Sequence, residues 1–178
     1  MAETTEELSN LADAILEVTL RRVRAELAER HGPPLAGLEG GAPREAGFAV
    51  ISLGKLGGRE LNYSSDIDLM FVYEAEGETG GPVRIPNKLF FQKLGNRCAE
   101  ILSAYTVEGR CYRVDLRLRP EGRLGEVAVS VEAARHYYQH RARDWELQML
   151  IKARCSAGDW RVWSASMRRW SRGSTPAA

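Results

Sequence analysis

Residues 57–73 read Gly-Gly-Arg-Glu-Leu-Asn-Tyr-Ser-Ser-Asp-Ile-Asp-Leu-Met-Phe-Val-Tyr, so Asp66 and Asp68 stand one residue apart at the start of an apolar run. Side chains two residues apart in a strand point to the same face, so this pair can hold one divalent ion while Ile67 faces the core. The sequence therefore predicts a strand over residues 68–73 that begins at a candidate metal site.

A third aspartate, Asp115, lies in residues 112–120, which read Tyr-Arg-Val-Asp-Leu-Arg-Leu-Arg-Pro. A carboxylate between Val114 and Leu116 is costly to bury without a cation, which favours a second ion site. Oxygen ligands suit hard cations such as Mg²⁺, and two-metal sites catalyse in-line phosphoryl transfer. Asp-x-Asp alone also occurs in solvated surface loops, so this assignment depends on the apolar run that follows it.

The composition is that of an ordinary globular domain, with 178 residues, 44% hydrophobic, 28% charged and a net charge of +1. The near-neutral charge argues against a protein that grips long nucleic acid, because such binding neutralises many phosphates. The sequence has no apolar run of about 18 residues, and its amino terminus is acidic. Its three cysteines lack zinc-site spacing and predict reduced thiols. We expect a cytoplasmic protein without membrane or nucleic-acid partners.

The hydrophobic pattern predicts an α+β fold, in the order helix, strand, strand, helix, strand, helix. The predicted strands form a small mixed sheet with helices on one face, preceded by an N-terminal helix. The expected helices cover about 5–30, 87–105 and a long segment from the cap Ser130 to about Arg154, and the expected strands cover 48–53, 68–73 and the surroundings of Asp115. The predicted organisation is an N-terminal helix (1–31), a loop (32–46), a domain that carries the three aspartates (47–159) and a tail (160–178).

Two motifs together resemble one family. The run Gly54-Lys55-Leu56-Gly57-Gly58-Arg59-Glu60-Leu61-Asn62 leads into Ser64-Ser65-Asp66-Ile67-Asp68, and Asp115-Leu116-Arg117-Leu118-Arg119-Pro120 follows. This pattern is similar to bifunctional glutamine synthetase adenylyltransferase/adenylyl-removing enzymes, of the DNA polymerase β-like nucleotidyltransferase superfamily. A third matching segment extends the resemblance over about residues 45–159. Its opening, Tyr137-Tyr138-Gln139, and its ending, Lys152-Ala153-Arg154, resemble the amino-terminal, adenylyl-removing unit more than the adenylylating one.

The resemblance implies a polymerase β-like core that transfers AMP at a tyrosine of glutamine synthetase, the expected protein substrate. In the removing direction, inorganic phosphate attacks the adenylyl-tyrosine and ADP leaves; in the adenylylating direction, AMP moves from ATP to the tyrosine. Two Mg²⁺ ions, ATP or ADP, and inorganic phosphate are the expected cofactors and substrates. In the intact family a regulatory protein that signals nitrogen status sets the balance between the two activities.

The resemblance also assigns site residues. Asp66, Asp68 and Asp115 are the expected catalytic residues and metal ligands. The residues expected to bind the nucleotide or its phosphates are Lys55, Gly57, Gly58, Ser64, Ser65, Arg117 and Arg119. Possible substrate-site residues are Arg143, Glu146 and Lys152. Structural roles without a ligand stay open as alternatives. The two glycines could form only a turn, and Arg117 and Arg119 could be the solvated face of a strand. The possible substrate-site residues could be ordinary charged residues of a long amphipathic helix.

The segment after Asp159 is rich in Trp, Arg and Ser and does not resemble the family. We expect a disordered tail there, of truncated or frame-shifted origin; the hypothesis requires a family-like continuation in another reading frame just past Asp159. Two further functions stay open. One is a non-catalytic module that binds a nucleotide or a partner without turnover. The other is a nucleic-acid nucleotidyltransferase, which the +1 charge disfavours and a test of oligonucleotide extension would check.

Overall fold

Two apolar runs form the centre of the sheet. The computed structural model describes residues 2–37 and 42–168. In it, β3 (Phe48–Ser52) and β4 (Ile67–Tyr73) pair antiparallel, from Phe48 opposite Tyr73 to Ser52 opposite Leu69. Every residue of β3 is buried, and so is every residue of β4 except Asp68. Strands buried on both faces are read in a sequence as continuous apolar runs, as these two are.

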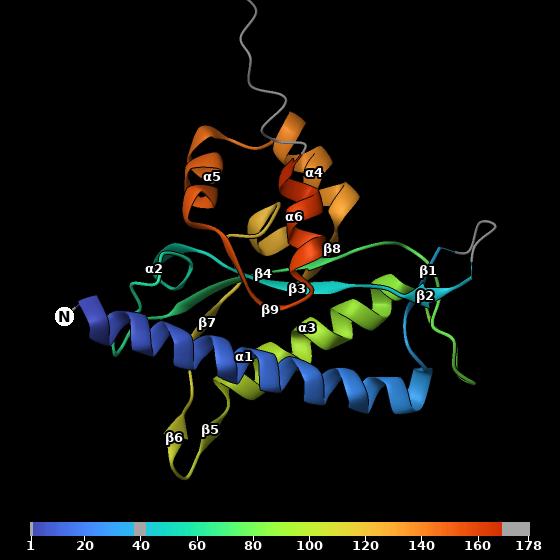
Figure 1. Cartoon of the computed structure of the whole chain (residues 1–178), viewed down its shortest axis with the longest axis horizontal. Coiled ribbons are helices and arrows are strands. Elements are labelled where there is room, and N and C mark those ends of the chain that lie inside the picture. Colours follow the sequence, from blue (N-terminus) through green and yellow to red (C-terminus); the bar gives the residue numbers. More distant parts are fainter. Residues whose placement is uncertain (1, 38–41, 169–178) are drawn as a thin grey trace, which may run out of the picture.

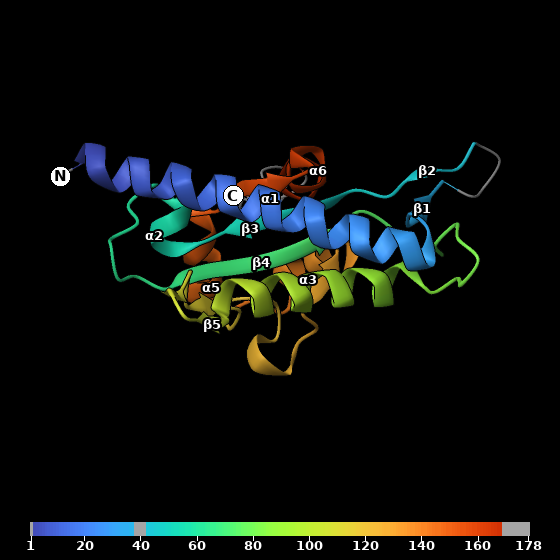
Figure 2. The same ribbon diagram turned by 90° about the horizontal axis from the view of Figure 1, so that it is seen from below.

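Helices cover both faces of this sheet (Figures 1 and 2). They are α1 (Ala2–His31), α2 (Gly54–Gly57), α3 (Asn87–Ser103), α4 (Val131–His140), α5 (Asp144–Met149) and α6 (Trp160–Arg168), with 3₁₀ turns η1 (Gly122–Leu124) and η2 (Leu150–Lys152). The remaining strands are β1 (Leu35–Ala36), β2 (Arg44–Glu45), β5 (Tyr105–Thr106), β6 (Gly109–Arg110), β7 (Val114–Asp115), β8 (Ala128–Ser130) and β9 (Arg154–Gly158).

The sheet is mixed, as predicted. Its strand order is β7-β4-β3-β9, with β8 also pairing with β4. Both β7 and β8 run parallel to β4, β7 beside its first two residues and β8 beside its last three. The antiparallel neighbours are β3 against β4 and β9 against β3. The parallel pairing of β7 with the start of β4 is the feature that positions the candidate site.

Alternating side chains of β3 and β4 supply two separate cores. One face packs under α1 and α3, where Phe91 stacks on Phe48 and Tyr73 with ring centroids 5.2 and 5.0 Å apart. The other face carries Ile51 and Met70 under α4 and α6. The expectation of helices on one face is therefore wrong, because an all-apolar strand leaves no face to water.

Helix α1 belongs to the first core, although the sequence analysis treated it as a preceding unit. Leu16 and Val23 are almost fully buried there. A second link is polar: Arg154 of β9 pairs with Asp13 in two contacts, at 2.5 and 3.1 Å, and donates to the Leu56 carbonyl at 2.9 Å. Both side chains are about four-fifths buried. The boundary predicted at residue 47 therefore does not separate two cores.

The single long helix predicted from Ser130 to Arg154 is wrong. Ser130 does cap a helix, since its Oγ accepts from the Ala133 N–H at 3.1 Å. However, α4 ends where the N–H groups of Arg141 and Ala142 both donate to the Tyr137 carbonyl. A new helix, α5, follows, and the chain then enters β9, a strand that the sequence analysis missed. The missed strand lies at the sheet edge and lacks an apolar alternation.

The tail expected to be disordered from residue 160 instead begins with a helix, α6. The Asp159 carboxylate accepts from the Arg161 N–H at 2.9 Å at the start of this helix, and Val162 is 3% exposed in the second core. The disorder prediction is therefore wrong for residues 160–168, and residues 169–178 lie outside the described part. The predicted loop at 32–46 likewise contains the short pair β1–β2, with residues 38–41 not described. None of the helices in the described ranges is long and apolar enough to cross a membrane.

We predict that Arg154→Met destabilises the chain by about 2–4 kcal/mol, because it strands the largely buried Asp13 carboxylate. Urea unfolding followed by circular dichroism would measure the change. The matched control is Arg22→Met, since Arg22 pairs with Glu26 on the exposed surface of α1 and should contribute about 0.5 kcal/mol or less. Equal losses in the two variants would refute the role given to the Arg154 pair.

Candidate active site

Three aspartates meet at the edge of the sheet where β7 pairs with β4. Asp68 and Asp115 are register partners on these parallel strands, and Asp66 immediately precedes β4. One more backbone hydrogen bond extends this pairing to the residue before β7: the Ile67 N–H donates to the Arg113 carbonyl at 2.9 Å. Neighbouring strands lie about 5 Å apart, so register partners bring their side chains together. The structure thus joins two motifs that are 47 residues apart in sequence (115 − 68).

The carboxylates of Asp68 and Asp115 have opposite electrostatic surroundings. Burial raises the pKa of Asp68, and the negative charges of Asp115 and Asp66 raise it further. The pKa of Asp115 is lowered, chiefly by hydrogen bonds from the Arg117 guanidinium. That guanidinium donates through Nε to Asp115 Oδ2 at 2.7 Å, and the Arg117 backbone N–H donates to Oδ1 at 2.8 Å. Asp68 is therefore the carboxylate that most needs a cation.

Gly54 leaves space for the Asp68 carboxylate because it carries no side chain. It has a φ of +53°, a conformation that favours glycine, and a Cβ built on it would lie 2.6 Å from Asp68 Oδ2. The Leu53 N–H just before it donates to the Asp68 carbonyl at 2.9 Å. The turn from β3 into α2 therefore lies directly against the carboxylate. Sequence analysis quoted Gly54 in a motif without giving it a role; its place at the end of an apolar strand was the available signal.

Two arginines hold the other two carboxylates. Arg113 forms an ion pair with Asp66 and donates to the Ser64 carbonyl at 2.7 Å, while Arg117 holds Asp115. Within the described residues no side chain hydrogen bonds to the Asp68 carboxylate, and no set of three ligands is already arranged around a metal position. Arg113 was not predicted as a site residue, and only its position two residues before Asp115 could have pointed to it.

The donor set nevertheless fits Mg²⁺. Three carboxylates converge on one edge, and burial together with the repulsion of Asp115 and Asp66 raises the pKa of Asp68, a condition that a divalent cation relieves. Asp66, Asp68 and Asp115 would hold the ions. The guanidinium groups of Arg113 and Arg117 would then move away from the carboxylates of Asp66 and Asp115. A bound cation would supply charge stabilisation for oxygens on phosphorus.

The loop that leads to Asp66 carries several of the predicted phosphate-binding residues. Lys55 Nζ lies 3.2 Å from Ser65 Oγ, so these two polar groups share one side of the loop. Gly57 is buried and packs closely against the backbone carbonyls of Ser52 and Lys152, which explains a glycine there without a ligand. Gly58 is only partly buried, beside the Lys152 side chain.

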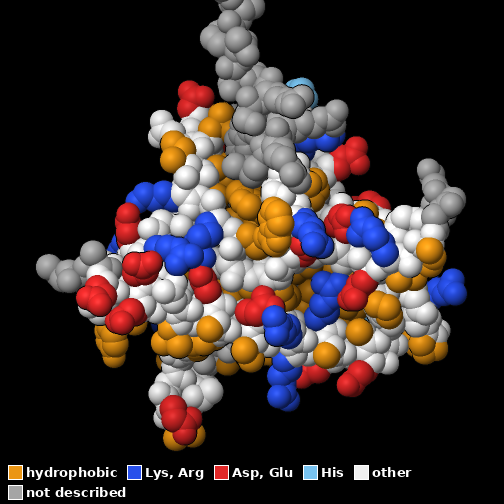
Figure 3. Space-filling model, viewed as in Figure 1, with side chains coloured by type: hydrophobic (Ala, Val, Ile, Leu, Met, Phe, Trp, Pro, Cys, Tyr) orange, Lys and Arg blue, Asp and Glu red, His pale blue; other side chains and the backbone are white. Residues whose placement is uncertain are grey.

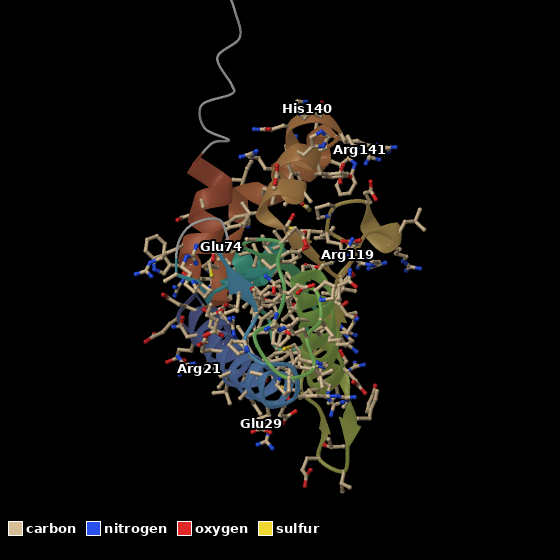
Figure 4. All side chains as sticks on the ribbon, turned by 90° about the vertical axis from the view of Figure 1, so that its right-hand side faces the viewer. Arg21, Glu29, Glu74, Arg119, His140 and Arg141 are labelled. Atoms are coloured by element: carbon tan, nitrogen blue, oxygen red, sulfur yellow. The ribbon has the colours of Figure 1, made fainter. Side chains whose placement is uncertain are left out.

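Other predicted residues have structural partners. Figure 4 shows Arg119 within the loop that carries η1, where it donates to the carbonyls of Leu116 at 2.7 Å and Gly125 at 2.9 Å. Glu146 is 6% exposed and accepts from the Tyr137 hydroxyl at 2.7 Å and the Arg143 N–H at 2.9 Å. Lys152 Nζ pairs with Glu60 at 2.9 Å on the surface. These four residues, Arg119, Arg143, Glu146 and Lys152, are not gathered around the aspartates by any of these contacts, and their part in ligand binding stays a prediction.

We predict that Asp68→Asn raises the thermal midpoint of the metal-free chain by about 1–3 °C. This shift corresponds to a gain of up to ~1 kcal/mol in the free energy of unfolding, since the group is partly exposed. The sign follows from the raised pKa of Asp68: the folded state holds this proton more tightly than the unfolded state, so ionisation costs stability as pH rises through that range. The difference should shrink in acid, where Asp68 is protonated. Asp144→Asn, at the exposed start of α5, is the control, and scanning calorimetry between pH 4 and 8 would decide.

We predict that Gly54→Ala weakens Mg²⁺ binding at least tenfold, because the new methyl group meets the Asp68 carboxylate. The control is Gly37→Ala, which introduces a similar left-handed strain at φ +81° with no described atom within 4 Å. Both variants should lose about 1 kcal/mol of stability, but only the first should lose metal affinity. Mn²⁺ binding followed by electron paramagnetic resonance measures this, and equal affinities in the two variants would refute the packing argument.

Residues 1–168 match the family of glutamate-ammonia ligase adenylyltransferases. Similar proteins are the bifunctional glutamine synthetase adenylyltransferase/adenylyl-removing enzymes of Thioalkalivibrio sulfidiphilus (strain HL-EbGR7), 43% identical over 157 residues, and of Pseudomonas aeruginosa, 44% identical over 160 residues. These matches cover 88% and 89% of this chain but only 16% of each relative's length. The family match also takes in α6, beyond the residue 159 at which the resemblance was expected to stop. This chain belongs to the glutamate-ammonia ligase adenylyltransferase family.

Proposed function

We propose that this chain is a Mg²⁺-dependent nucleotidyltransferase unit that transfers AMP at a tyrosine of glutamine synthetase. The observation that carries the proposal is the register pairing of Asp68 with Asp115, with Asp66 at the start of the same strand. The substrate follows from the relatives, whose names give both an adenylyltransferase and an adenylyl-removing activity on glutamine synthetase. The whole enzymes are several times longer, so activity in this part alone is included in the proposal.

Transfer of AMP needs an attacking and a leaving oxygen in line at the α-phosphorus, with the developing charge stabilised. The aspartates would hold the ions on one side of that phosphorus. Arg117, once a cation takes over the Asp115 carboxylate, carries a free guanidinium on the same edge and would bind phosphate oxygens through its planar fork. Lys55 and the hydroxyl of Ser65, which already lie together, would contact the phosphates from the loop side.

We infer that the removing direction is the one this chain catalyses. Phosphate oxygen then bonds to the α-phosphorus, the bond from phosphorus to the tyrosine oxygen breaks, and ADP and free tyrosine result. The support is the resemblance of residues 137–139 and 152–154 to the removing unit. The alternative is the adenylylating direction, in which the tyrosine oxygen attacks the α-phosphorus of ATP and pyrophosphate leaves. The proposed cytoplasmic location depends on the sequence composition, and the nitrogen-signalling regulatory partner depends on the resemblance alone.

A third possibility, a binding module without turnover, is favoured by one observation. Arg113 and Arg117 occupy two of the three carboxylates, so a chain in which they do not release them would hold no catalytic metal ions and would bind a nucleotide or a partner without transferring AMP. Turnover distinguishes this module from an enzyme.

We predict that the chain releases ADP from adenylylated glutamine synthetase in the presence of phosphate and Mg²⁺. Asp68→Ala should lower the rate at least 10³-fold, since it removes the proposed ligand of β4 that lies opposite Asp115. Asp144→Ala, an exposed aspartate on α5, should keep the wild-type rate. High-pressure liquid chromatography of the nucleotides distinguishes the two directions, since the removing reaction releases ADP and the adenylylating reaction consumes ATP and releases pyrophosphate. ADP release that survives Asp68→Ala would refute the site, and ATP-dependent release of pyrophosphate alone would assign the adenylylating direction.

A further inference from the structure

A small hairpin beside the aspartates exposes apolar and aromatic side chains. β5 and β6 pair antiparallel, with Tyr105 opposite Arg110, and the pair stands out from the body of the molecule (Figures 1 and 3). Tyr105 is 78% exposed and Val107, at the tip, is fully exposed. In Figure 3 the end of this projection carries hydrophobic and acidic side chains.

Local contacts fix the hairpin. The Arg110 guanidinium lies 4.8 Å from the centre of the Tyr105 ring, and Thr106 Oγ1 donates to the Gly109 carbonyl at 2.8 Å. At its base the Tyr112 N–H donates to the Leu102 carbonyl at 2.9 Å. Two-residue strands are marginal on their own in water, so these contacts keep an apolar tip in place that makes no contribution to either core.

The hairpin leads directly into the candidate active site. Asp115 lies five positions after Arg110 (115 − 110), and between them Arg113 joins Ser64 to Asp66. A polar hollow of about 240 Å³ opens there, lined by Tyr63, Ser64, Ser65, Arg110, Cys111, Tyr112 and Arg113. Tyr63, on the rim, is 93% exposed. The hairpin and the aspartates therefore border one continuous surface.

The length of a tyrosine side chain limits how far the backbone of a protein substrate can lie from the aspartates. A tyrosine side chain extends about 7 Å from its backbone, roughly two extended residues. The backbone of a protein substrate whose tyrosine oxygen reaches the aspartates must therefore lie against the rim of the site. The rim offers an exposed ring at Tyr63 and the Arg110 guanidinium, which forms no ion pair with a carboxylate of the described residues. The hairpin that carries Arg110 extends this surface to the apolar tip at Val107.

We propose that the β5–β6 hairpin and the adjoining hollow bind the polypeptide of glutamine synthetase that flanks its reactive tyrosine. The chemistry fits a segment with an apolar residue against Val107 and an acidic residue against Arg110. This proposal rests on the proposed function for the identity of the partner, and it adds the surface by which that partner is recognised.

The experiment places a photoreactive benzoylphenylalanine at Val107 of the 178-residue chain, mixes it with adenylylated or unmodified glutamine synthetase, and detects adducts by gel and mass spectrometry. The control carries the same group at Val83, which is 52% exposed in the loop before α3, at the other end of the molecule (Figure 1). We expect adducts from position 107 only, with the crosslinked peptide containing the reactive tyrosine. Nucleotide binding is measured in parallel on the same samples.

A second variant, Val107→Asp, should raise the KM for adenylylated glutamine synthetase about tenfold with kcat and ADP affinity unchanged; Val83→Asp should change none of these. Adducts formed equally from both positions, or absent at position 107 while Mg²⁺–ADP still binds, would overturn the docking surface and leave the catalytic proposal standing. Loss of nucleotide binding and of Asp68-dependent turnover, with the crosslink retained, would instead overturn the catalytic proposal and support the docking surface.

Discussion

Burial of β3 and β4 on both faces is the constraint on which the rest of this structure depends. Their apolar runs have to be covered above and below, so α1 and α3 pack on one face while α4 and α6 pack on the other. A strand in that position cannot carry charge along its length. The charges of Asp66 and Asp68 are tolerated because they lie at the first end of β4, where the sheet meets solvent beside β7.

Negative charges repel one another at the same end of the strand. Three carboxylates converge there, and burial together with this repulsion raises the pKa of Asp68, so that its ionisation opposes folding. Arg113 and Arg117 reduce the repulsion by pairing with Asp66 and Asp115. Both arginines lie close in sequence to Asp115, one on each side of β7. The short segment from Arg113 to Arg117 therefore supplies one of the three carboxylates together with the positive charges that stabilise two of them.

The features predictable from the sequence were those with a strong local signal. The aspartate motifs, the helix over 87–105 and the two apolar strands all follow from residue type and spacing. The structure confirms the helix and the two strands, and it brings the aspartates of the two motifs together. The break after α4 did not, because it depends on Glu146 accepting from the Arg143 N–H, a contact between residues that also suit a continuous helix. β9 was missed because its strand character comes from pairing with β3, which periodicity does not reveal. The site roles of Gly54 and Arg113 depend on tertiary contacts for the same reason.

The missed strand, β9, also supports the turn that lies against the Asp68 carboxylate. β9 carries Arg154, and Arg154 reaches both Asp13 of α1 and the carbonyl groups of Leu56 and Gly57 in the α2 turn. That turn begins at Gly54, whose backbone lies against the Asp68 carboxylate. One arginine far from the aspartates in sequence therefore links the N-terminal helix, the outer strand and the turn that supports the site. A residue that resembles part of a family motif thus contacts the backbone that supports the aspartates.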